Sequence, residues 1–329
     1  MDIRKTLLIG ALLFLSVALL YPLSIFVPSM YDGDIRFQVK KGESFGAIAE
    51  RLQDDGLIRS SEVLKLIAKL TGIEGKIKSG EYRFRGRLSP YVVLKALVSG
   101  RVVLYEVTIP EGYNIWQIGE RLEEAGIIKS EEFLEAAFNR ELLEKMGVDA
   151  PSFEGYLFPD TYRFPKNPSP ERIIMDMVTN TRRHISPEML KRADELGLTE
   201  NKLLTLASII EKETGVDEER PVVSAVFHNR LKRGMLLQSD PTAVYGAKGL
   251  SEGVTSADLR RPSPYNTYLN KGLPPGPICS PGLSSIRAAL YPADVDYLFF
   301  VSKRNGRHYF SRTEAEHLRA VNRFLRRRR

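Results

Sequence analysis

Cysteine and histidine are scarce in this sequence, and their scarcity excludes several classes of site. Cys279 is the only cysteine among 329 residues, so neither an intramolecular disulfide nor a cluster of metal-binding thiolates can form. The four histidines are far apart, and none has the spacing of a zinc-binding helix. Glycine-rich phosphate-binding loops are also absent. We therefore expect neither a metal nor an organic cofactor.

A strong excess of one charge is absent as well. Lys and Arg number 48 and Asp and Glu 41, a net charge of +7 that is spread along the chain except for the tail Arg326–Arg329. We expect this tail, residues 326–329, to be solvated, and we expect no nucleic-acid partner. Hydrophobic residues at 43% and charged residues at 27% are typical of globular proteins and exclude a wholly disordered chain.

The long apolar run that the sequence does contain lies at its N-terminus. Leu7–Val27 is almost entirely apolar and would span about 31 Å as a helix, the thickness of a bilayer core. The run is longer than the core of a signal peptide, and no A-x-A cleavage site follows it, although a cleaved signal is the alternative. We predict a cytoplasmic stub at 1–5, a transmembrane anchor at 6–30 and the remaining chain outside the cytoplasm.

An internal repeat organises the next part of the chain. The segment ERLQDDGLIRSSEVL at 50–64 and the segment ERLEEAGIIKSEEFL at 120–134 are identical at just over half of their positions. In each copy a short strand, two capped helices and a second strand are expected. This β-α-α-β pattern resembles the LysM glycan-binding module, and we assign a LysM-like domain to 34–104. A duplicated structural block without a ligand is the alternative.

The pattern changes in the second half, where helices and Pro-rich loops dominate. We predict a polar helical region at 170–196, helices at 202–214, 283–290 and 313–325, and strands at 297–302 and 308–311. The fold class is therefore α+β, with an N-terminal transmembrane helix, a small LysM-like domain and a mixed α+β catalytic domain at 105–325.

Two glutamates flank the apolar face of the helix at 202–214. At 100° per residue, Glu213 lies between Leu206 and Ile209, and Glu211 lies on the other edge of the face. Lys212 is expected to face water. A carboxyl at the rim of an apolar face and at the negative end of a helix should have a raised pKa, as a general acid requires. Two solvated acids at a helix end are the alternative.

Polar and aromatic residues gather on the loops that follow this helix. Amides and hydroxyls bind sugar hydroxyls, and aromatic rings stack on the apolar faces of pyranoses. The predicted sugar-binding residues are Gln238, Asp240, Tyr265, Asn266, Tyr268, Glu154 and Tyr156.

The order of these segments resembles the endolytic murein transglycosylase family, also called YceG-like. The resemblance rests on the apolar N-terminus, the LysM-like unit and the motifs EGYLFPDTY, LASIIEKET, RLKRGMLLQSDPTAVYG, SPYNTY and GLPPGPICSPG. It implies a bacterial inner-membrane lyase whose periplasmic domain cuts within nascent peptidoglycan glycan strands and ends their elongation. It also implies that Glu213 is the catalytic residue, with peptidoglycan as substrate and membrane peptidoglycan synthases as candidate partners.

One carboxyl is sufficient for this reaction. Glu213 would protonate the bond between N-acetylmuramic acid and N-acetylglucosamine and then take the proton of the C6 hydroxyl, which closes a 1,6-anhydro ring. Two alternatives stay open at this point. One is a two-carboxylate muramidase in which Asp240 or Glu211 is the second acid; the other is a peptidoglycan-binding scaffold without activity.

Overall fold

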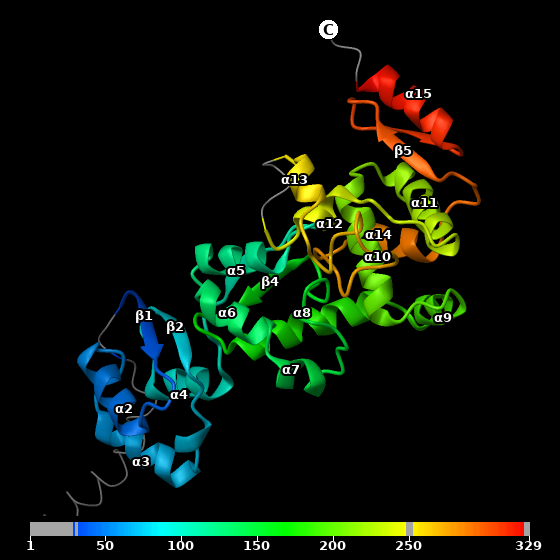
Figure 1. Ribbon diagram of the computed structural model, residues 1–329. Helices are drawn as coiled ribbons and strands as arrows, with labels where there is room; N and C mark the ends of the chain where they lie inside the picture. Colours follow the sequence, from blue (N-terminus) through cyan, green and yellow to red (C-terminus); the bar gives the residue numbers. More distant parts are fainter. Residues whose placement is uncertain (1–28, 30–31, 248–252, 326–329) are drawn as a thin grey trace, which may run out of the picture. The chain divides into compact units, whose positions relative to one another are not determined.

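The computed structural model describes residue 29, residues 32–247 and residues 253–325. Nearly all of the predicted span at 6–30, the stub at 1–5 and the tail at 326–329 lie outside these residues. Within the described part of the chain, no helix is long and apolar enough to cross a bilayer. The chain forms two compact units, of which the first runs to Tyr105 and includes Pro165–Asn167, and the second takes in the remaining residues (Figure 1).

The first unit is a two-stranded antiparallel sheet with helices packed on one face. Its elements are β1 (Asp34–Val39), α2 (Phe45–Asp54), α3 (Ser61–Thr71), η2 (Glu74–Lys76), β2 (Gly80–Arg85) and α4 (Pro90–Ser99). The hydroxyls of Ser44 and Ser60 cap α2 and α3, as predicted. Phe37 on β1 stands opposite Tyr82 on β2, and both are buried in the core of the unit.

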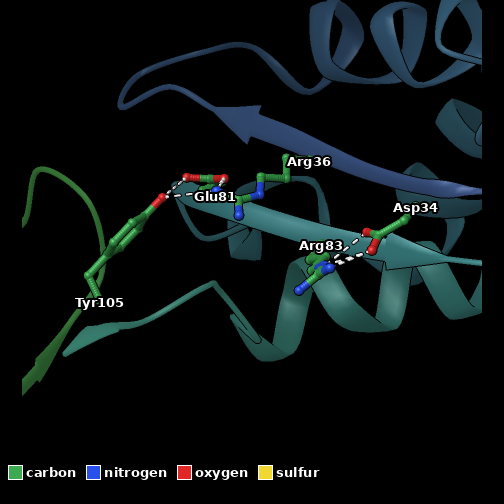
Figure 2. A network of polar contacts seen from close by, with 5 residues as sticks. All are labelled: Asp34, Arg36, Glu81, Arg83 and Tyr105. Atoms are coloured by element: carbon green, nitrogen blue, oxygen red, sulfur yellow. Dashed lines mark hydrogen bonds and ion pairs between the residues drawn. The ribbon is translucent and has the colours of Figure 1, made fainter. Parts of the chain in front are cut away.

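The other face of this sheet carries a network of charged side chains (Figure 2). Arg83 forms an ion pair with Asp34 across the strands, and Arg36 donates a hydrogen bond to Glu81 at 3.2 Å. The hydroxyl of Tyr105 donates to the other oxygen of Glu81 at 2.7 Å. This hydrogen bond holds Tyr105, the last residue of the first unit's main segment, against β2. The Glu81 side chain that accepts the bond is largely buried.

The second copy of the repeat begins the second unit. Strand β3 (Tyr105–Thr108) pairs with β4 (Thr161–Phe164), and between them lie α5 (Ile115–Glu124), α6 (Ser130–Ala137) and α7 (Arg140–Lys145). The predicted strand-helix-helix-strand order is thus confirmed in the first copy, and in the second copy α7 is inserted before the closing strand. One detail differs, because Ser130 is the first residue of α6 and Lys129 occupies the N-cap.

The remaining elements of the second unit surround one buried helix. They are α8 (Pro170–His184), α9 (Pro187–Glu195), α10 (Glu200–Glu213), η3 (Asp217–Glu219), α11 (Arg220–Lys232), α12 (Asp240–Val244), α13 (Ser256–Leu259), α14 (Leu283–Leu290), β5 (Phe299–Ser302), β6 (His308–Ser311) and α15 (Glu314–Phe324). The mixed α+β class is confirmed, and the predicted helical region at 170–196 contains two helices, α8 and α9.

Helix α10 is the central helix of the second unit. Every residue from Leu203 to Ile210 is buried, because α9, α11, α12 and α14 all pack on it. The expectation of one apolar face was therefore wrong, since the helix is covered on all sides. Lys212 does not face water as predicted, because it is half-buried and its ammonium donates to the carbonyl of Gly112 at 3.1 Å.

Two of the motifs identified in the sequence help to hold this helix in place. The amide of Ile278, in GLPPGPICSPG, donates to the buried hydroxyl of Ser208 on α10 at 3.0 Å. Gly155, in EGYLFPDTY, has a φ of +79°, and a Cβ there would collide with the ring of Pro277. The two motifs therefore pack against each other, which holds the C-terminal half of α10 in place.

Candidate active site

A cavity of about 500 Å³ opens beside the C-terminal end of α10. Its walls come from α10, α11, the loop before α12, the segment after α13, and the C-terminal group of β5, β6 and α15. It is lined by Glu213, Arg230, Leu237, Gln238, Asp240, Tyr268, Phe300, Val301, Ser302, His308, His317, Val321 and Leu325. Segments more than 100 positions apart in the sequence thus meet at one polar hollow.

Glu213 is the last residue of α10 and lies in this cavity. Burial raises the pKa of Glu213 to about 7, and the negative charge of Asp240 acts in the same direction. A hydrogen bond from Ser239 and the positive charge of Arg230 oppose the increase in this pKa. A carboxyl with a pKa near 7 holds its proton in a large fraction of molecules at neutral pH and can both donate and accept one.

A chain of buried hydroxyls fixes the position of this carboxyl. The hydroxyl of Ser239 donates to Glu213 Oε1 at 2.5 Å, and Ser239 is itself held by Thr267 and Thr242. Thr267 Oγ1 accepts from the amide of Ser239 at 3.0 Å, and the two threonine hydroxyls lie 2.7 Å apart. All three hydroxyl side chains are buried, so the carboxyl has one well-defined hydrogen-bonded orientation.

Glu211 lies on a different side of the helix, away from the cavity lining. Its Oε1 pairs with Arg220 Nη2 at 3.3 Å and its Oε2 accepts from the amide of Gly282 at 3.0 Å. Only 7% of each side chain of the Glu211–Arg220 pair is exposed. Glu211 is therefore engaged in holding α10, α11 and the start of α14 together.

The family model described as the YceG-like family matches residues 37–323. The chain belongs to the YceG-like family. It is 32% identical to the endolytic murein transglycosylase of Bacillus subtilis strain 168, over 95% of this chain and 91% of that protein. It is 31% identical to the endolytic murein transglycosylase of Streptococcus pneumoniae D39, over 86% of this chain and 57% of that protein.

A crystal structure of a yceG-like protein from Listeria monocytogenes is also similar. Its TM-score is 0.60 with 32% sequence identity, and the match covers 87% of this chain and 98% of that one. The fold described above is therefore that of the YceG-like family.

The polar wall of the cavity in this family member includes three more of the predicted residues. Asp240 begins α12, and its Oδ1 accepts a hydrogen bond from the hydroxyl of Tyr268 at 2.6 Å. Gln238 has a φ of +50°, and its backbone N–H donates to the carbonyl of Thr267 at 3.2 Å. The loops QSDPT and SPYNTY are thereby joined, so that Gln238, Asp240 and Tyr268 line the cavity with Glu213.

The structure places the other predicted residues outside the cavity lining. Asn266 is fully buried, and its side-chain amide donates to the carbonyls of Leu259 and Arg261 at 3.1 and 2.9 Å. Glu154 and Tyr156 are also buried, and Tyr265 packs its ring on another tyrosine. The tight packing of the loops explains the burial of Asn266, Glu154 and Tyr156, which their polar composition did not indicate, and Tyr265 is half-buried.

Arg230 is a residue of the cavity that sequence reasoning missed. It is buried on α11 and its guanidinium donates to the carbonyls of Leu298 and Leu237 at 2.6 and 2.8 Å. It thereby ties the β5 region to the loop that carries Ser239. The motif RLKRGMLLQ contains Arg230, but two other basic residues follow it closely. Nothing in the sequence distinguishes Arg230 from them.

The C-terminal wall of the cavity was also missed. His308 on β6 contacts the carboxylate of Glu219 through its side chain at 2.8 Å, and the ring of His317 stacks on Phe299 with centroids 5.2 Å apart. Burial lowers the pKa of His317, so its ring is neutral at pH 7. Both histidines are far from Glu213 in the sequence, and no spacing rule could join them.

Proposed function

We propose that this chain is a lytic transglycosylase that cuts within the glycan strands of peptidoglycan, with Glu213 as its single acid and base. The observation that carries the proposal is the position of Glu213 in the cavity, with a pKa near 7 and a fixed hydrogen bond from Ser239. Membership of a family whose curated relatives are named endolytic murein transglycosylase supports the same substrate.

The reaction requires one proton to leave Glu213 and one to return. The protonated carboxyl donates to the oxygen that links N-acetylmuramic acid to N-acetylglucosamine, and the bond from C1 of muramic acid to that oxygen breaks. The N-acetylglucosamine part leaves with a hydroxyl. The C6 hydroxyl of the same muramic acid then attacks C1 and gives its proton to the Glu213 carboxylate. The product is a 1,6-anhydro end, and the enzyme regains its starting state without water.

The other polar residues of the cavity have supporting roles in this proposal. Gln238, Asp240 and Tyr268 bind the sugar hydroxyls and acetamido groups, since they present amide, carboxylate and phenol groups to the cavity. Ser239 is a positioning residue, because it acts on the substrate only through Glu213. No step of this mechanism requires a metal or an organic cofactor.

A muramidase that uses two carboxylates is the second candidate, because Asp240 lines the same cavity as Glu213. Glu211 is less suited to that role, because Arg220 and Gly282 already occupy its carboxylate. Mass analysis of the fragments separates the two reactions. Transglycosylation leaves ends lighter by one water than the reducing ends that hydrolysis leaves, so reducing ends alone would refute the proposal.

The first unit is the proposed glycan-binding part of the protein. Its β-α-α-β core resembles a LysM module, which would hold the strand while the second unit cuts it. The apolar N-terminus would anchor the enzyme in the inner membrane, with both units on the periplasmic side, near the peptidoglycan synthases that make its substrate. A chain that binds insoluble peptidoglycan but never cuts it would favour the scaffold alternative.

A further inference from the structure

Four aromatic rings form a continuous row in the second unit. The rings of Tyr265 and Tyr245 have centroids 4.6 Å apart, those of Tyr245 and Trp116 are 5.5 Å apart, and those of Trp116 and Phe138 are 6.1 Å apart. Tyr265, Tyr245 and Trp116 are half-buried, and Phe138 is 45% exposed. All four residues of the row are therefore at least partly accessible to solvent.

Helix α12 lies between the cavity that holds Glu213 and the row. Helix α12 begins at Asp240, which lines the cavity, and Tyr245 follows its last residue, about 8 Å further along the helix axis. In Figure 1, α12 lies in the second unit together with α5, which carries Trp116. The cavity and the row are thus separated by one short helix.

One buried carboxyl holds two of these rings in place. Glu154 Oε2 accepts hydrogen bonds from the hydroxyl of Tyr245 and from the amide of Ile115, both at 3.0 Å. Ile115 directly precedes Trp116, so the same oxygen positions both neighbouring rings. The other oxygen, Oε1, is buried and has no hydrogen-bond partner among the described residues, which leaves Glu154 able to accept one more.

The repeat shows that Trp116 is not needed for the fold of its own unit. In the first copy, the residue at the equivalent position of α2 is Gly46, and the same β-α-α-β arrangement forms without a ring there. Trp116 is therefore a feature of the second copy alone, the copy that adjoins the cavity.

We propose that Trp116 and Tyr245, with Tyr265 and Phe138 on either side, form distal subsites that stack on pyranose rings of the strand being cut. The apolar C–H faces of a pyranose fit the π-faces of aromatic rings, and the hydroxyls at the edges of the sugar stay in water. Cutting within a strand requires sugars on both sides of the cut, and the row offers a place for those beyond the cavity. The inference rests on the proposed function, because it assigns more of the same substrate to the same enzyme.

The chain contains a single tryptophan, so its fluorescence reports on this row alone. We would titrate the full-length Glu213→Gln protein in detergent with peptide-free glycan oligosaccharides of two and of eight sugars. Saturable change of the Trp116 emission is expected with the octasaccharide and not with the disaccharide, because only the longer ligand reaches from the cavity to the row. The inactive variant keeps the ligand intact during the titration.

Substitutions within the row give the matched comparison. Tyr245→Ala should weaken binding of the octasaccharide roughly tenfold, whereas Tyr245→Phe keeps the ring and most of the affinity. Tyr291→Ala is the control, since Tyr291 is a tyrosine that is 51% exposed and is no part of the row. In the active enzyme, Trp116→Ala should raise KM for long strands about tenfold and leave cleavage of the shortest substrate unchanged.

Several results would overturn the inference while the proposed chemistry stands. These are a disaccharide that changes Trp116 emission as much as the octasaccharide, or octasaccharide binding that calorimetry detects but Trp116 does not. An emission that changes with protein concentration alone would assign the row to a second copy of the chain. Reducing ends in place of anhydro ends would instead refute the proposed function and leave the binding result intact.

Discussion

Replacing Glu213 by Gln removes the proposed acid with little change of shape. The amide oxygen of the new side chain can still accept the hydrogen bond from Ser239, which donates to Glu213 Oε1 at 2.5 Å. What is lost is the ability to give and take a proton, together with the negative charge at high pH. The variant should therefore change activity and stability in opposite directions.

The effect on stability follows from the pKa of the buried carboxyl. Burial raises the pKa of Glu213 from 4.5 to about 7, so between these pH values the folded protein holds a proton that the unfolded chain has released. The free energy of unfolding therefore falls as the pH rises through this window. Above pH 7 the loss is complete and amounts to about 3 kcal/mol, and below pH 4.5 it is absent.

Because Gln carries no charge, the variant avoids this loss. Glu213→Gln should match the wild type at pH 4.5 and be more stable at pH 8 by up to about 3 kcal/mol, or roughly 6–12 °C in the melting temperature of the second unit. Glu154 has a raised pKa too, for the same reason of burial, but it is present in both proteins and cancels in the comparison. Thermal melts of both proteins at the two pH values measure the difference.

The effect on activity is a loss of about 10² to 10⁴ in the rate of anhydro-end formation, the usual contribution of general acid–base catalysis. Glu211→Gln is the control on the same helix. It breaks the buried pair with Arg220, which costs stability of about 3–5 kcal/mol, but the rate per folded molecule should fall less than tenfold.

Two results would refute this reasoning. If Glu213→Gln releases anhydro ends at the wild-type rate, Glu213 is not the acid. If the stability difference between variant and wild type is the same at pH 4.5 and pH 8, the carboxyl is not desolvated and its pKa is not near 7. Loss of activity in Glu211→Gln alone would assign catalysis to the other side of α10.

Further predictions concern the neighbours of the acid and the first unit. Activity should decline with an alkaline pKa near 7, and Ser239→Ala should move that limb of the pH–rate profile upward and reduce kcat about tenfold or more, because its hydrogen bond lowers the pKa of Glu213. Asp240→Asn should move the same limb downward, because the negative charge of Asp240 raises that pKa; shifts in one common direction would contradict both assignments. Asn266→Ala should lower the melting temperature markedly, by the loss of about 2–4 kcal/mol, since it strands buried carbonyls; an unchanged melting curve would show that this loop does not depend on the amide. Deletion of 34–104 should weaken sedimentation with insoluble peptidoglycan while the melting transition of the second unit persists; unchanged sedimentation would reduce the first unit to a spacer.

Local sequence signals were sufficient for most elements of the fold. Serine and threonine caps, glycines after helices and the repeat predicted the presence of α2, α3 and α5, and they predicted α14 and α15 to within one residue at each end, because these signals act through backbone hydrogen bonds within a few positions. Helical geometry placed Glu213 and Glu211 on the two edges of one face, but it did not choose between them. The choice of Glu213 as the proposed acid came from the resemblance to the motifs of the family.

The tertiary structure decided which loop residues line the cavity and which are buried in the hydrogen bonds that hold the loops together. Asn266 and Glu154 have the same polar character as Asp240 and Gln238, yet the first two are buried in hydrogen bonds and the last two line the cavity. Arg230, His308 and the ring of Trp116 gained their surroundings only through contacts between segments far apart in the chain. Composition and spacing report on neighbours in sequence, whereas the burial and the pKa of a side chain depend on neighbours in space, and only folding brings those together.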